Sequence, residues 1–114
     1  MPFINSKISI KITSEEKDII KTKLGSAIEL IPGKSEDWLM VGFEDECSLY
    51  FKGKASEKIA FIEVKIFGTT SKEAYSMLTS EICNIYNDVL GIPKDKIYVK
   101  YEEVSNWGWN GNNF

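Results

Sequence analysis

The chain of 114 residues contains no histidine and only two cysteines, Cys47 and Cys83. Without histidine, zinc and iron sites lose their commonest ligand, and a serine or cysteine nucleophile activated by histidine is excluded. Two cysteines do not make the disulfide framework of a small domain, so we expect both to be reduced structural thiols. Any acid–base chemistry then falls to Asp, Glu, Lys, Tyr, Cys or the terminal amine, and no metal or cofactor is expected.

Strongly basic stretches and long apolar runs are also missing. The net charge of −3 argues against nucleic acid as the main partner. No run approaches the length of a membrane span, and polar residues interrupt the segment 3–12 too often for a signal peptide. We therefore expect neither a nucleic-acid partner nor a membrane partner.

The composition is that of one folded domain covering residues 1–114, since 43% of the residues are hydrophobic and 12% are aromatic. The chain contains an internal repeat, about residues 3–45 and 59–103. A tail at 104–114 is rich in tryptophan and almost free of charge.

Each repeat predicts a strand, a helix and a second strand. In the first repeat, a strand with one buried face is predicted by isoleucines of one parity, which are Ile4, Ile8, Ile10 and Ile12. A capping-box pattern from Thr13 to Glu16 starts the helix, Pro32 and the glycine after it end the helix, and residues 38–43 predict the next strand.

The second repeat follows the same order. Residues 59–66 predict a strand, Thr70 to Glu73 again form a capping-box pattern, and apolar residues at helical spacing follow. Gly91 and the proline two residues later end this helix, and residues 96–102 predict the last strand. The segment 47–57 that joins the repeats is expected to hold a turn and a short edge strand.

Two tandem β-α-β units predict an α/β (α+β) fold with a four-stranded mixed sheet. Right-handed crossovers place both helices on one face of that sheet. The other face must meet solvent or other subunits.

Pro2 is the candidate for chemistry. The initiator methionine is normally removed before so small a residue, which would leave Pro2 as a secondary amine held in a ring. A modest lowering of its pKa makes such an amine neutral, and so a base, at the pH of the cell. The alternative is an incidental second residue before a strand.

Four motifs occur in register from one end of the chain to the other: Met1-Pro2-Phe3-Ile4, Pro32-Gly33-Lys34, Ile97-Tyr98-Val99 and Trp107-Gly108-Trp109-Asn110-Gly111. With these motifs the chain resembles the macrophage migration inhibitory factor (MIF) family of the tautomerase superfamily. The resemblance implies a homotrimer whose three sheets face a central channel. It also implies a cofactor-free keto–enol tautomerase for phenylpyruvate- or dopachrome-type substrates, with a small aromatic 2-oxo acid as the bound partner.

The resemblance also implies roles for single residues. Pro2 would be the catalytic base, Lys34 would bind the substrate carboxylate, and Tyr98 would reach into a neighbouring subunit's cleft. The pocket would be lined by Trp38, Val64, Trp107, Trp109 and Phe114, with the backbone around Val64 also in contact with the ligand. The alternatives are that Lys34 only interacts favourably with a helix C-terminus, that Tyr98 is an ordinary aromatic residue of a strand, and that the pocket residues only pack in the core or at an interface.

The chain departs from the family pattern in its middle. Lys100 stands where the family commonly has asparagine, and it would add a second cation at the cleft mouth. Glu63 replaces a small polar residue, and its carboxylate would raise the pKa of Pro2 unless Lys34 or Lys100 neutralises it. The family's Cys-x-x-Cys pair is absent at residues 57–60, so thiol oxidoreductase activity is not implied.

Two other functions stay open. Family members act as secreted cytokines without a signal peptide, which would make a host or cell-surface receptor the partner. We expect a cytoplasmic protein, and this second function would require its secretion without a signal peptide. The other open function is that of a trimeric scaffold whose pocket has decayed. Glu63 and the loss of glycines after the third strand support this alternative.

Overall fold

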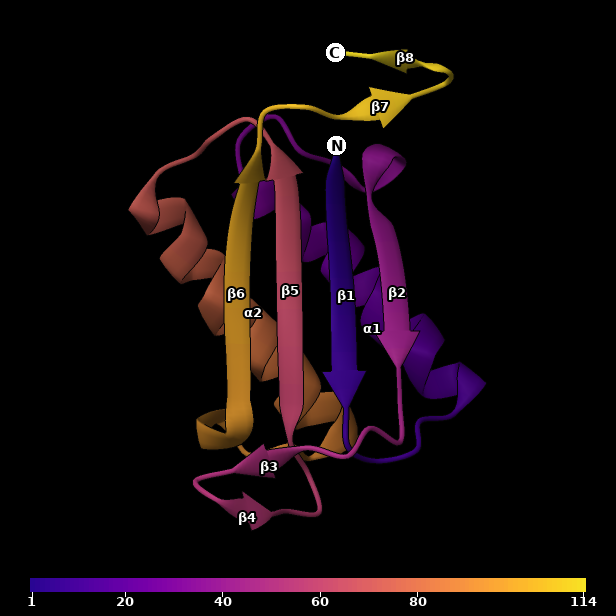
Figure 1. Ribbon diagram of the computed structural model, residues 1–114, viewed down its shortest axis with the longest axis vertical. Coiled ribbons are helices and arrows are strands. Elements are labelled where there is room, and N and C mark those ends of the chain that lie inside the picture. Colours follow the sequence, from indigo (N-terminus) through magenta and orange to yellow (C-terminus); the bar gives the residue numbers. More distant parts are fainter.

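The computed structural model describes residues 1–114 and has a four-stranded sheet with two helices packed on one face (Figure 1). The first unit consists of β1 (Pro2–Ile8), α1 (Ser14–Ala27) and β2 (Met40–Glu44). The second unit consists of β5 (Ala60–Phe67), α2 (Lys72–Leu90) and β6 (Ile97–Val104). Three short 3-10 turns lie at Ile28–Leu30, Glu36–Trp38 and Lys94–Lys96.

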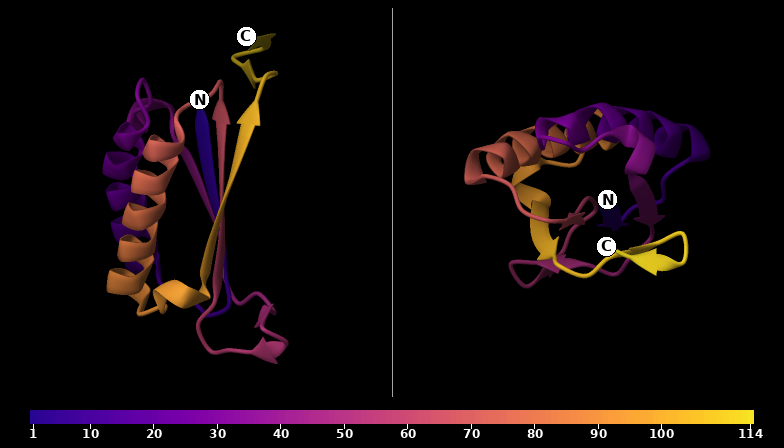
Figure 2. Two further views of the ribbon diagram at one scale, coloured as in Figure 1. Left: turned by 90° about the vertical axis from the view of Figure 1, so that its left-hand side faces the viewer. Right: turned by 90° about the horizontal axis from the view of Figure 1, so that it is seen from above.

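The order of the strands in the sheet is β2-β1-β5-β6. Within each unit the two strands are parallel, and the two units meet where β1 pairs antiparallel with β5. Seen from the side, both helices cover the same face of the sheet (Figure 2). The predicted mixed sheet with two helices on one face is therefore confirmed.

Two small hairpins flank this sheet at opposite ends (Figure 1). One, β3 (Tyr50–Phe51) with β4 (Lys54–Ala55), lies in the segment that joins the two units. The other, β7 (Gly108–Trp109) with β8 (Asn112–Asn113), forms the tail and lies above the start of β1.

The core lies between the sheet and the helices and contains 19 buried hydrophobic residues. Burial alternates along β1 and along β5, which is the pattern of strands with one covered face. One polar residue, Ser6, is fully buried on this face, and its hydroxyl is hydrogen-bonded to the hydroxyl of Tyr86 on α2. The core therefore contains one polar pair, with both hydroxyls satisfied by each other.

The helix ends follow from local hydrogen bonds. The predicted capping box of α1 is present, since Thr13 Oγ1 accepts from the amide of Glu16 and the Glu16 carboxylate accepts from the amide of Thr13. The prediction for α2 was wrong by one residue: Ser71 is the N-cap, and its hydroxyl accepts from the amide of Ala74. Gly91 ends α2 in the left-handed conformation, with φ of 69°.

Several strand boundaries also differ from the predictions by one or more residues, and two of them have a clear local cause. β1 ends at Ile8, before Ile10 and Ile12, because the chain bends there and the hydroxyl of Ser9 binds the backbone at Ile59. β2 begins at Met40 rather than at Trp38, since Trp38 belongs to the preceding 3-10 turn. The joining segment forms a two-stranded hairpin rather than a single short strand.

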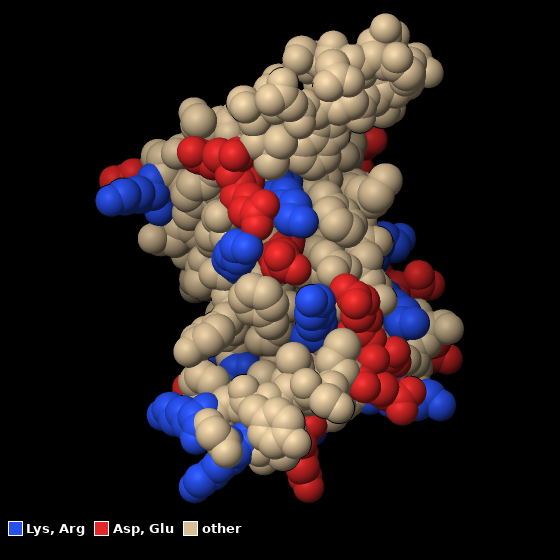
Figure 3. Space-filling model, viewed as in Figure 1, with Lys and Arg blue, Asp and Glu red and all other residues tan.

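The helix-free face of the sheet carries interleaved lysines and glutamates, and the tail above it is an uncharged block (Figure 3). On this face Asn5 Nδ2 donates to Glu44 at 2.7 Å, and Lys100 lies 2.7 Å from Glu102. None of the helices combines the length and the apolarity that crossing a membrane requires.

Candidate active site

The N-terminus of the chain lies at the end of the sheet where β5 ends and β2 begins. Pro2 pairs with Ile66 of β5, and Phe3 pairs with Met40 of β2. The carbonyl of Met1 accepts a hydrogen bond of 3.1 Å from the amide of Phe67. The start of β1 is therefore fixed between two strands, and Pro2 is buried there.

A cleft of about 620 Å³ opens at this end of the sheet. Seven of its ten lining residues are hydrophobic; the ten are Met1, Pro2, Phe3, Asp37, Trp38, Leu39, Met40, Trp107, Gly108 and Trp109. The indole of Trp38 meets the indole of Trp109 edge to face, with ring centroids 5.0 Å apart. This wall joins residues 71 positions apart in the sequence and has the aromatic character that suits a flat ring.

Lys34 lies beside the N-terminal amine. Its Nζ donates a hydrogen bond of 2.8 Å to the carbonyl of Phe67, at the end of β5. Burial lowers the pKa of the Met1 amino group, and the positive charge and hydrogen bond of Lys34 lower that pKa further. An amine at this place is therefore biased towards its neutral form.

The tail is fastened by its last residue. The amide of Phe114 donates to the carbonyl of Trp107 at 3.0 Å, and the turn between β7 and β8 uses positive φ at Asn110 and Gly111. The Phe114 ring packs on Phe67 with centroids 5.5 Å apart, and it does not line the cleft. Phe114 thus holds Trp107 and Trp109 over the start of β1.

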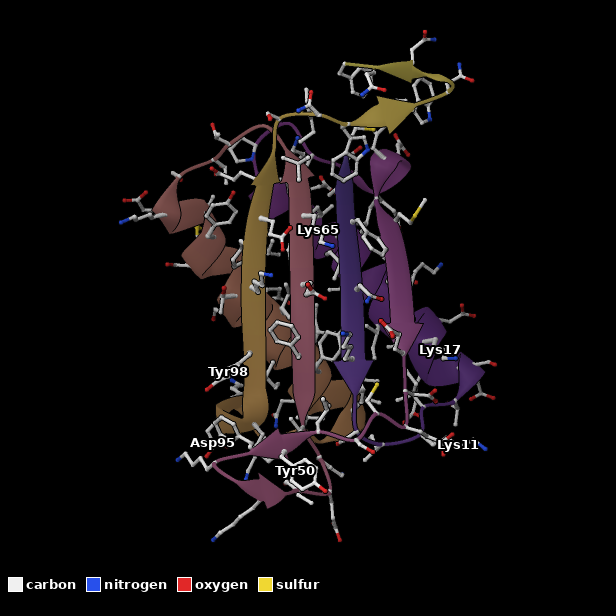
Figure 4. The ribbon with its side chains drawn as sticks, in the orientation of Figure 1. Lys11, Lys17, Tyr50, Lys65, Asp95 and Tyr98 are labelled. Carbon is white, nitrogen blue, oxygen red and sulfur yellow. The ribbon has the colours of Figure 1, made fainter.

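Val64 and Tyr98 are not part of the cleft of a single chain. The side chain of Val64 is fully buried in the core beneath the sheet, so only its backbone is available for a ligand. Tyr98 is the second residue of β6, at the other end of the sheet from the cleft (Figure 4). Its ring meets that of Phe51 edge to face, with centroids 5.4 Å apart. Tyr98 is 61% exposed, which leaves it accessible to a neighbouring molecule.

Lys100 and Glu63 also lie away from the cleft of their own chain. They are paired across β5 and β6, with Lys100 Nζ 3.9 Å from the Glu63 carboxylate and 2.7 Å from that of Glu102. Glu63 faces Asn5, three residues along β1 from Pro2, which is about 10 Å at the usual rise of a strand. In one chain, Lys100 therefore offsets the charge of Glu63 rather than adding a cation to the cleft.

Asp37 lines the cleft, although the sequence analysis did not single it out. It is exposed, and it lies in the 3-10 turn just before Trp38. The neighbouring Trp38 was the one signal that pointed to this turn. Asp37 is the only charged side chain among the ten lining residues.

The family model of macrophage migration inhibitory factor (MIF) matches residues 1–114. The chain is similar to the solved structure of Leishmania major MIF2, with 29% identity over 100% of this chain and 97% of that chain, and a TM-score of 0.93. The MIF homologue from Prochlorococcus marinus is 27% identical over 98% of each chain, with a TM-score of 0.83.

The macrophage migration inhibitory factor-like protein from Entamoeba histolytica is 25% identical over 99% of this chain and 98% of its own, with a TM-score of 0.87. No curated protein sequence matches the chain. The family model thus covers every residue, and the solved structures agree with it over nearly the whole chain. This chain belongs to the macrophage migration inhibitory factor family and has the fold of the tautomerase superfamily.

Proposed function

We propose that this protein is a cofactor-free keto–enol tautomerase with Pro2 as its general base. The observation that carries the proposal is the place of the N-terminal amine at an aromatic cleft beside Lys34, where burial and this cation lower its pKa. After removal of Met1 the amine belongs to Pro2, which is the next residue and the first of β1. A neutral ring nitrogen at this place has a lone pair and little freedom to lose on binding.

The reaction moves one proton and needs no other reactant. The Pro2 nitrogen takes a proton from the carbon next to the substrate's carbonyl, and the C–H electron pair forms the carbon–carbon double bond of the enol. The carbonyl π electrons move to oxygen, which receives a proton from the protonated amine. The reverse sequence converts enol to ketone.

Lys34 binds the substrate's carboxylate and carbonyl oxygen in this proposal. Its ammonium stabilises the negative charge that develops on oxygen during proton transfer, and it also disfavours the protonated form of Pro2. Phenylpyruvate-type and dopachrome-type substrates are the proposed class, because Trp38 and Trp109 offer an edge-to-face aromatic wall beside the amine.

We propose a homotrimer as the working form. In one chain the exposed Tyr98 lies at the opposite end of the sheet from Pro2, so Tyr98 serves a cleft only if it belongs to a neighbouring subunit. Lys100 projects from the same strand face and would approach the cleft in the same way. The helix-free face of the sheet supports this assembly, since it lacks any covering layer within the chain.

The proposal is tested by following the conversion of enol to keto phenylpyruvate by ultraviolet absorbance. The protein carries no tag, and intact mass verifies that Met1 is absent. We expect turnover by the wild type and its loss in Pro2→Gly, while Pro93→Gly, a proline replaced at the far end of α2, keeps activity. Turnover at the wild-type rate by Pro2→Gly would refute the role of Pro2. No turnover by folded wild-type protein would refute the enzyme and favour receptor binding instead.

A further inference from the structure

A cation and a carboxylate flank the start of β1: Lys34 lies beside the cleft without lining it, and Asp37 is part of its lining. Lys34 Nζ lies at the end of β5, where it is bonded to the carbonyl of Phe67. Asp37 lies in the turn that leads into β2. Because the strand order is β2-β1-β5, the start of β1 with Pro2 lies between the cation and the carboxylate.

The strands next to these two groups, β5 and β2, are separated by a distance that suits one extended aromatic acid. Two strand spacings are about 10 Å, which is comparable with the length of a phenylpyruvate from its carboxylate to the para position of its ring. A substrate whose carboxylate binds Lys34 therefore directs its ring past Trp38 and its para substituent towards Asp37. The aromatic wall between the two charges is uncharged.

The charge of Asp37 is not neutralised within the chain. Both salt bridges in the structure belong to Lys100, and no hydrogen bond to the Asp37 carboxylate is formed. The preceding residue, Glu36, likewise forms no salt bridge, but its carboxylate lies elsewhere. Its carboxylate lies over Gly25 of α1, so closely that a Cβ at residue 25 would collide with it, and Glu36 does not line the cleft.

We infer that Asp37 is a specificity-determining residue, which selects aromatic 2-oxo acids with a cationic or hydrogen-donating group at the far end of the ring and rejects those with a second anion there. This inference rests on the proposed tautomerase function, because it takes the carboxylate to be held at Lys34. The physical reason is that an unpaired carboxylate beside an apolar wall attracts a cation and repels an anion.

The test compares probe substrates that differ only in the para substituent. These are 4-(aminomethyl)phenylpyruvate and 4-carboxyphenylpyruvate, and the readout is the ratio of their kcat/KM values for one enzyme preparation. The ratio cancels any general loss of folded or active protein. Asp37→Asn removes the charge at constant shape, and Glu36→Gln is the matched control in the adjacent position.

We expect the wild type to prefer the cationic probe, and Asp37→Asn to reduce the ratio by about tenfold, because the exposed charge attracts one probe and repels the other. Glu36→Gln should keep the wild-type ratio. An equal effect of both substitutions, or an unchanged ratio in Asp37→Asn, would overturn the inference.

A binding measurement separates this inference from the proposed function. Both probes are titrated against the quenching of the tryptophan fluorescence, since three tryptophans line the cleft. If the wild type binds the cationic probe more tightly but converts neither, the tautomerase proposal fails and the role of Asp37 stands. If both probes bind equally, or neither binds, the role of Asp37 is refuted whatever the activity.

Discussion

Lys34 is hydrogen-bonded to Phe67: the ammonium of Lys34 donates a hydrogen bond of 2.8 Å to the Phe67 carbonyl at the end of β5. The cation is therefore held next to the N-terminal amine before any substrate arrives. Pro2 pairs with Ile66, the residue before Phe67, so the end of β5 positions both the cation and the start of β1. The electrostatics of the cleft are thus built into the sheet.

Replacing Lys34 by methionine should move the pH profile of the reaction. The nearby cation disfavours the protonated amine, so Lys34 lowers the amine's pKa, and its removal raises that pKa towards the ordinary value. The base is active when neutral, so the acidic limb of kcat/KM should shift to higher pH in Lys34→Met. Lys11→Met, at the far end of the molecule (Figure 4), should leave the limb in place. If the acidic limb of the pH profile of Lys34→Met lay at the same pH as in the wild type, the role of this cation would be contradicted.

Trp109→Ala should weaken substrate binding. The substitution removes an indole from the cleft and the edge-to-face contact with Trp38. Aromatic pairs of this kind contribute about 0.5–1.5 kcal/mol beyond area burial, so we expect KM for phenylpyruvate to rise about three- to tenfold. Met77→Ala, an exposed apolar truncation on α2, is the control and should keep the wild-type KM. Equal KM values in both variants would remove Trp109 from the binding wall.

The buried pair of Ser6 and Tyr86 should be energetically coupled. Tyr86→Phe leaves the Ser6 hydroxyl without a partner in the core, which costs about 1–3 kcal/mol of unfolding free energy. The double variant with Ser6→Ala removes both hydroxyls, and its loss should be smaller than the sum of the two single losses. Urea denaturation of the four proteins measures the coupling. Strictly additive losses would mean that this hydrogen bond stabilises nothing.

Two inactive variants should restore activity when they share a trimer. Pro2→Gly lacks the base, and Tyr98→Ala lacks the residue proposed to enter a neighbouring cleft. When equal amounts are unfolded and reassembled together, about a quarter of the sites regain both residues from two different chains. The mixture should therefore turn over phenylpyruvate faster than either variant alone. Activity no higher than the average of the two would place Tyr98 outside its neighbour's site.

Much of the fold could be predicted because local chemistry and tertiary structure agree. Isoleucine parity, the capping box at Thr13 and the stop at Gly91 each reflect a requirement that the structure meets. The errors are at boundaries where long-range contacts decide. The hydroxyl of Ser9 binds the backbone at Ile59, 50 residues away, and this contact helps to end β1 before the isoleucine pattern does.

The cleft could be predicted only in part. Pro2, Trp107 and Trp109 belong to the motifs, and Trp38 follows from the family resemblance; all four line the cleft. Asp37 also lines the cleft but could not be predicted, because a sequence does not reveal which of many exposed carboxylates lies beside an apolar hollow. The position of Lys100 depends equally on its register with Glu63 across two strands, which only the folded sheet defines.

The two β-α-β units are alike in architecture but differ in the nitrogen at the start of their first strand. A smaller hollow of about 100 Å³ lies beside the start of β5, and Ala60 there occupies the position that Pro2 occupies in β1. The nitrogen of Ala60 is a peptide nitrogen, whose lone pair is delocalised into the carbonyl and cannot accept a proton. Repetition of the scaffold therefore did not repeat the proposed base. For the same reason, any fusion joined ahead of Pro2 would give the proposed reactive end the same inert peptide nitrogen that Ala60 has.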